Sequence, residues 1–93
     1  MPIFYLHVAD GKLFAEDIEG QEFHDVEAAR RAAIVGLRDT MASEMKNGQI
    51  NMAAFIEIED ENHQLVMTVP FLEAVDVLTQ HYRRRRKKSD RQT

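Results

Sequence analysis

Four histidines are the side chains in this sequence best suited to bind a metal ion or to transfer a proton: His7, His24, His63 and His81. A zinc site brings three or four ligands to about 2.0–2.1 Å from the metal, usually with a local pair such as H-x-x-x-H. No two of these histidines are close in the chain. We therefore expect no metal ligand and no cofactor. We predict that His24 and His63 are exposed and that His7 is hydrogen-bonded within a strand.

Two acidic clusters could supply paired carboxylates, which perform acid–base chemistry when burial separates their pKa values. They comprise Glu16, Asp17 and Glu19, and then Glu57, Glu59, Asp60 and Glu61. Neither cluster has the D-x-[DN]-x-[DN]-G spacing of an EF-hand calcium loop. We interpret the first as a solvated turn and the second as the outward face of a strand.

Nucleophiles are few, because the chain has no cysteine and its two serines, Ser43 and Ser89, do not lie in a G-x-S-x-G motif. Its four glycines form neither a phosphate loop nor a dinucleotide-binding pattern. We predict that the protein is not an enzyme and has no catalytic residue. Tyr5 and His7, which share one face of a predicted strand, are a weak candidate for a pocket.

The C-terminal end carries six consecutive basic residues. Residues 1–82 contain 5 Lys and Arg against 15 Asp and Glu, whereas residues 83–93 contain 7 against 1. This run could bind nucleic-acid phosphates, could pair with an acidic surface of its own or another chain, or could be a solvated end. The contact residues for either kind of binding are Tyr82, Arg83, Arg84, Arg85, Arg86, Lys87, Lys88 and Arg91.

Ninety-three residues are enough for one small domain, which we place at residues 1–82, followed by a basic tail at 83–93. No apolar stretch approaches the ~18 residues of a transmembrane helix. The first residues lack the basic start and small-residue cleavage site of a signal peptide. Together with the absence of cysteine, these features predict a cytoplasmic protein.

Alternating apolar residues predict a central strand over residues 2–8, with Ile3, Tyr5 and His7 on one face. Asp10-Gly11 indicates a hairpin, and residues 13–18 are the predicted returning strand. Residues 54–59 and 64–69 predict a second hairpin, with Ala54, Ile56 and Ile58 facing inward, as do Leu65, Met67 and Val69.

Two helices are predicted. The first spans residues 26–47, with Asp25 as its N-cap and Asn47-Gly48 at its end. Its buried stripe comprises Val26, Ala29, Ala33, Leu37, Met41 and Met45. Ile34 and Val35 lie away from this stripe, so we expect both to be exposed and to form a dimer contact. The second helix is predicted over 71–82, where Phe71, Ala74, Val75, Leu78 and Tyr82 have helical spacing.

The methionines allow two interpretations. Met41, Met45, Met52 and Met67 could line an adaptable binding groove, but such residues more often fill a core, which is the interpretation we favour. The element order β-β-α-β-β-α predicts an α+β fold. In it, an antiparallel sheet of two hairpins is covered on one face by the long helix and the C-terminal helix.

The motifs MP-FY-HV-DG, D-EG-EF-D-EAAR and DEN…V-TVPF-EA resemble a family of small, mainly alphaproteobacterial proteins known only as a domain of unknown function. The resemblance covers about residues 1–78 and implies a stand-alone bacterial cytoplasmic protein. It carries over no activity and no site residue. Family members commonly have glycine in the second hairpin turn, where this chain has Asn62-His63, and Asn62 tolerates the left-handed conformation.

We therefore expect a small non-enzymatic interaction or regulatory protein, a homodimer, that recognises a protein partner through its helix face or its tail. The alternative is a nucleic-acid-associated accessory protein that binds phosphates through the basic tail. Binding by the tail would weaken steeply with salt, whereas an apolar contact would not.

Overall fold

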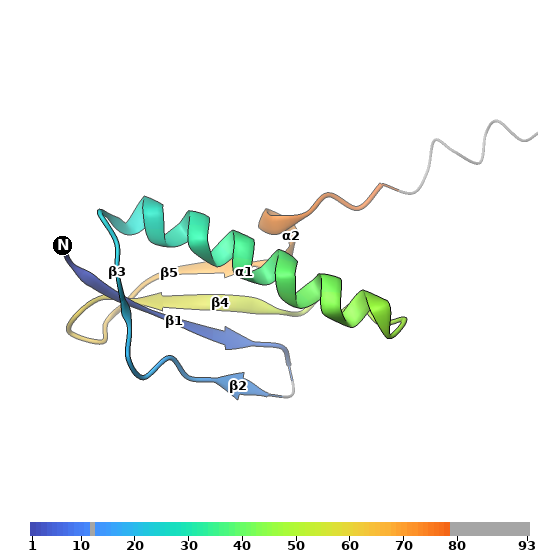
Figure 1. The fold of residues 1–93 in the computed structure, drawn as a ribbon, viewed down its shortest axis with the longest axis horizontal. Helices are drawn as coiled ribbons and strands as arrows, with labels where there is room; N and C mark the ends of the chain where they lie inside the picture. Colours follow the sequence, from blue (N-terminus) through green and yellow to red (C-terminus); the bar gives the residue numbers. More distant parts are fainter. Residues whose placement is uncertain (12, 79–93) are drawn as a thin grey trace, which may run out of the picture.

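The computed structural model describes residues 1–11 and 13–78 (Figure 1). The predicted tail contacts at Tyr82, Arg83 to Lys88 and Arg91 lie outside the described residues, as do residues 79–82 of the second predicted helix. In chain order, the elements are β1 (Ile3–Ala9), β2 (Phe14–Ala15), β3 (Gln21–Glu22), α1 (Val26–Lys46), β4 (Phe55–Glu59), β5 (Leu65–Pro70) and α2 (Phe71–Ala74).

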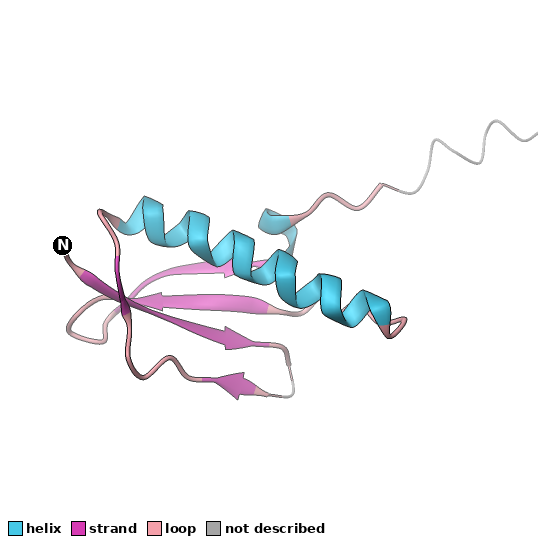
Figure 2. Ribbon diagram, in the orientation of Figure 1, coloured by secondary structure: helices cyan, strands magenta, loops and turns pink. Residues whose placement is uncertain are grey.

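The strands form one antiparallel sheet in the order β2-β1-β4-β5, and β3 also pairs with β1 (Figure 2). The two hairpins are joined through β1 and β4, whose pairing sets Leu6 opposite Ile58 and Val8 opposite Ile56. The long helix and the short C-terminal helix pack on this sheet. The predicted α+β class is confirmed, and so is the central position of β1.

Helix α1 begins and ends where the sequence predicts. The carboxylate of Asp25 accepts a hydrogen bond from the backbone N–H of Ala28 at 2.8 Å, and Gly48 has a φ of 78° just after the C-cap. Twenty-one residues make the helix about 31 Å long, enough to cross the sheet. Among the described residues, no helix is long and apolar enough to cross a membrane.

Replacing Asp25 with alanine is expected to lower the free energy of unfolding by about 1 kcal/mol, because a first-turn amide loses its acceptor. Urea denaturation followed by circular dichroism measures the change. Asp39→Ala is the control, since Asp39 is exposed in the middle of α1 and alanine favours the helix. Equal losses in both variants would show that the cap contributes nothing specific.

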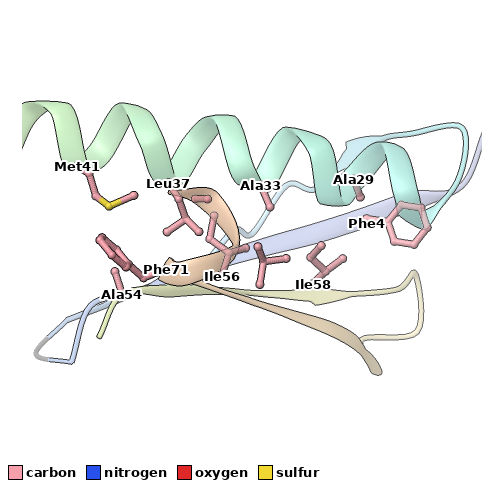
Figure 3. Close-up of a cluster of buried hydrophobic side chains, with 11 residues drawn as sticks. Phe4, Ala29, Ala33, Leu37, Met41, Ala54, Ile56, Ile58 and Phe71 are labelled. Carbon is pink, nitrogen blue, oxygen red and sulfur yellow. The ribbon is translucent and has the colours of Figure 1, made fainter. Parts of the chain in front are cut away.

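The core lies between α1 and one face of the sheet (Figure 3). Ala29 and Ala33 are fully buried, and these small side chains let the helix backbone approach the sheet closely. The predicted inward set Ala54, Ile56 and Ile58 is confirmed. The cluster comprises Phe4, Ala29, Ala33, Leu37, Met41, Ala54, Ile56, Ile58, Val69, Phe71 and Ala74.

Three predicted orientations are wrong. Met45 was expected on the buried stripe of α1 but is exposed in its last turn. Ile34 was expected to be exposed but is half-buried and packs against the core, because α1 lies so close to the sheet; Val35 is exposed. Leu65 was expected to share a face with Met67 but is exposed. The register shifts between Ile58, which pairs with Met67, and Glu59, which pairs with Leu65, so a bulge separates the two side chains.

The second predicted helix is also wrong in extent, because α2 ends at Ala74. Val75 is extended, with φ −144° and ψ 156°. The β-branched side chains of Val75 and Val77 flank Asp76, and all three residue types are poor helix formers. The apolar spacing through Leu78 therefore does not produce a helix in the described residues.

Candidate functional site

His7 lies on the face of β1 that points away from α1, and it is only 3% exposed. Its Nε2 atom is 2.9 Å from the carboxylate of Glu59, and its Nδ1 atom accepts a hydrogen bond from the backbone N–H of Asp17 at 2.9 Å. Because Nδ1 is an acceptor, the proton of the neutral ring is on Nε2 and is donated to Glu59. The predicted strand histidine is confirmed. Both ring nitrogens are occupied, which leaves neither for a substrate or a metal ion.

The loop between β2 and β3 supplies the cover over His7. Asp17 accepts hydrogen bonds from the backbone N–H groups of Leu6 and Gly20, each at 3.0 Å. Its carboxylate thus takes the place that a strand carbonyl would have opposite β1. The predicted strand over residues 13–18 is wrong for this reason: β2 is two residues long, and β3 resumes the pairing with β1 after the loop.

Aromatic contacts complete the cluster. Tyr5 stacks on His63 with ring centroids 4.3 Å apart, and His7 contacts Phe14 with centroids 5.5 Å apart. His63 has a φ of 61°, so the left-handed residue of the second turn is His63 and not Asn62 as expected. Its position in the turn places its ring over Tyr5.

Glu59 joins the two histidines. One oxygen of its carboxylate is 2.9 Å from Nε2 of His7 and 3.3 Å from Nδ1 of His63. The hydrogen bond from His7 is the largest cause that holds the pKa of Glu59 below its ordinary value of 4.5, and the contact with His63 acts in the same direction. Desolvation opposes this shift without reversing it.

Glu59→Gln is expected to reduce stability at about pH 7 and to have a smaller effect at about pH 3. The sign follows from the lowered pKa: the ionised carboxylate stabilises the fold above pH 4.5, and this contribution is lost as the pH falls through the lower folded-state value. Urea midpoints of both proteins across this range measure the effect. A difference that stays constant with pH would show that the charge of the Glu59 carboxylate does not contribute to stability. Glu57→Gln, on the same strand, is the control.

The hydrogen bonds of this cluster join β1, β4 and the β2–β3 loop. In residues 1–11 and 13–78, no three His, Cys, Asp or Glu side chains are grouped so that they could hold a metal ion. Tyr5 and His7, the candidate pocket residues, are brought together by β1 but line neither of the grooves described next. His24 and His63 are exposed as predicted.

An apolar groove of about 710 Å³ lies between the C-terminal half of α1 and the extended segment after α2. Arg38 of α1 fixes the start of the extended segment, because its Nε donates a hydrogen bond to the backbone oxygen of Ala74 at 2.7 Å. Arg38 and Asp76 are the charged residues of the lining. Among the described residues, the lining comprises Arg38, Met41, Ala42, Met45, Ile50, Met52, Phe71, Val75, Asp76, Val77 and Leu78.

A second, smaller apolar hollow adjoins the groove, since Met52 and Phe71 line both. Several large apolar side chains are exposed at this end of the molecule: Met45, Ile50, Met52, Leu72, Val77 and Leu78. The favoured interpretation of the methionines as core residues holds for Met41 and Met67, whereas Met45 and Met52 are exposed. The alternative, a groove lined by methionines, holds for Met41, Met45 and Met52. The other wall of the groove was not predicted, because Val75 and Leu78 were expected on a helix.

The fold and these surfaces define a small α+β protein in which one long helix covers one face of an antiparallel sheet. Residues 3–72 match the family described as Domain of unknown function (DUF6894), and the chain belongs to this family. No curated protein and no solved structure matches the chain. The matched region contains the His7 cluster and ends before residues 75–78, which form one wall of the groove.

Proposed function

We propose that this chain is a small interaction protein that binds an amphipathic helix of a partner protein in the apolar groove. The observation that carries the proposal is the continuous apolar surface at one end of the molecule, from Met45 to Leu72. Large apolar patches on soluble proteins mark interaction sites. A groove between two elements suits the apolar face of a helix, and unbranched methionine side chains adapt to such a face.

The charge around the groove indicates the polar side of this partner. Arg38 and Asp76 offset each other within the lining. The basic run begins five residues after Leu78, which forms part of the groove wall. A bound helix with acidic residues on its polar face would therefore meet positive charge close to the groove.

Location and assembly are part of the same proposal. The resemblance to alphaproteobacterial proteins supports a bacterial cytoplasmic location, and Val35 remains an exposed apolar residue on α1 for contact with a second copy. Nucleic-acid binding through the tail is the alternative function. It predicts binding of a labelled DNA duplex that falls steeply between about 50 and 200 mM salt.

Fluorescence anisotropy with two labelled peptides tests the proposal. The first contains leucine, alanine and glutamate, with leucine at i, i+3, i+4 and i+7; in the second, every glutamate is lysine. We expect the full-length chain to bind the acidic peptide about tenfold more tightly, which corresponds to about 1.4 kcal/mol. Equal binding of both peptides, or binding of neither, would overturn the proposed partner.

Two matched variants locate the binding surface. Met45→Ser removes an apolar side chain from the groove and is expected to weaken binding of the acidic peptide about tenfold. Ile18→Ser removes a similarly exposed side chain from the β2–β3 loop and should leave binding unchanged. Light scattering of the unbound chain shows whether a second copy occupies the groove instead; a dimer that Met45→Ser dissociates would overturn the proposal.

A further inference from the structure

The charges of this protein are divided between its two layers. Residues 1–25 and 51–70, which form the sheet and its loops, contain ten Asp and Glu but a single basic residue, Lys12. Residues 26–50, which form α1 and its C-terminal turn, contain four Arg and Lys against three Asp and Glu. The acidity of the folded part is therefore a property of the sheet layer.

Two of these carboxylates, Glu57 and Glu59, lie on the face of the sheet opposite α1. Ile56 and Ile58 point into the core, so the alternation of β4 places Glu57 and Glu59 on the other face. Thr68 pairs with Glu57 across the ladder and is exposed. In the described residues, α1 and α2 both pack on the core side (Figure 3), and the β2–β3 loop covers the opposite face only at His7.

Among the described residues, no arginine or lysine pairs with Glu57 or Glu59. Within the described residues, both ion pairs that involve arginine lie on the helix side, where Arg30 binds Glu27 and Glu73. On the sheet side, Glu59 contacts histidines. Glu57 is half-buried on β4 and has no ionic partner among the described residues.

We infer that the basic run Arg83–Lys88 docks on the acidic side of the sheet, opposite α1, within the same molecule. The charge is complementary, because the run has six consecutive basic residues and the sheet with its loops carries ten Asp and Glu against one Lys. The reach is sufficient: an extended chain places Arg83 up to about 17 Å and Lys88 up to about 35 Å beyond Leu78, and the two shorter dimensions of the molecule are 25 and 17 Å. A run docked on this face does not lie beside the groove, so docking competes with the charged contact proposed for the helix partner.

The basic run is covalently linked to the domain, so weak contacts are enough to hold it on the sheet. An exposed ion pair contributes only about 0.2–1 kcal/mol. A segment tied to its target by a short linker experiences a millimolar effective concentration, so several such pairs together can hold it without a high intrinsic affinity. The docked state must then be sensitive to salt, because exposed charges are screened within about 10 Å at 0.1 M salt and about 3 Å at 1 M.

Zero-length carbodiimide cross-linking of the full-length chain tests the inference. The reagent joins the amines of Lys87 and Lys88 to carboxylates in direct contact with them, and mass spectrometry identifies the joined residues. We expect cross-links to Glu57, Glu59 and the acids of the β2–β3 loop, and about tenfold fewer at 1 M salt. Glu27, Glu44 and Glu73 on the helix side are internal controls.

Two further measurements distinguish the possible outcomes of the cross-linking. A mixture of ¹⁵N-labelled and unlabelled copies separates links within one molecule from links between two. Amide chemical shifts of the full-length chain are compared with those of a variant in which residues 83–88 are all glutamine; we expect changes confined to β1, β4 and β5. The inference is overturned by links mainly between copies, by equal labelling of the helix-side acids, or by no links together with unchanged sheet amides.

Discussion

Gly20→Ala is expected to lower the free energy of unfolding by about 2–4 kcal/mol, a large part of the stability of a chain of this size. Gly20 has a φ of 73°, where an L side chain costs roughly 1–2 kcal/mol. A Cβ atom added there would lie 2.7 Å from Cγ2 of Ile3 and 2.9 Å from Cε1 of Tyr5. Either the β2–β3 loop or the side chains of Ile3 and Tyr5 must then move, and movement of the loop also disturbs the cover over His7.

Gly48→Ala is the matched control, because the two effects at Gly20 can be separated there. Gly48 has a similar φ of 78°, but nothing lies within 4 Å of an added Cβ. Only the cost of a positive φ remains at Gly48, so we expect the free energy of unfolding to fall by about 1–2 kcal/mol. Urea denaturation of the three proteins gives both values. Equal losses at the two glycines would show that the loop yields freely and that its contact with β1 is not tight.

Leu37→Ala is expected to cost about 2–5 kcal/mol, the range for removing a fully buried leucine. Leu37 is 1% exposed and lies in the middle of the buried stripe of α1, facing the sheet (Figure 3). Its neighbours on the stripe, Ala33 and Met41, cannot both move to fill the space, since Ala33 is already fully buried. A cavity should therefore persist between α1 and β4.

Leu13→Ala provides the comparison for this core substitution. Leu13 is 72% exposed beside β2, so the same change of side chain should alter stability by no more than about 0.5 kcal/mol. Thermal and urea unfolding monitored by circular dichroism measure both variants. A loss below about 1 kcal/mol for Leu37→Ala would mean that the layers close over the cavity, contrary to the close packing of the alanines.

The sequence was sufficient to predict those features that depend only on neighbouring residues. Asp25 and Gly48 mark the limits of α1 because capping and the left-handed conformation depend on residues next to each other. The alternation of Ala54, Ile56 and Ile58 predicted the buried face of β4 because the side-chain period of a strand is fixed. The fold class follows from these elements and their order.

Features that depend on distant residues were not predictable in the same way. Asp17 interrupts a strand only because Leu6 offers an unpaired amide, and the partners of His7 come from positions 17 and 59. The groove exists because the helix after Pro70 stops at Ala74, where an arginine on α1 binds the last carbonyl. A helical spacing of apolar residues gives no information about such an early end.

The pairing of β1 with β4 also determines when this protein can fold during its synthesis. The central ladder joins residues 5–9 to residues 55–59, so about fifty residues separate the two strands. Until β4 is available, β1 has only the two short strands β2 and β3 beside it, and α1 has no complete sheet on which to bury its stripe. Closing this long loop precedes most of the stabilising contacts. We therefore expect the growing chain to fold in one late step, after the ribosome has synthesised β4. The elements do not fold one after another as they are synthesised.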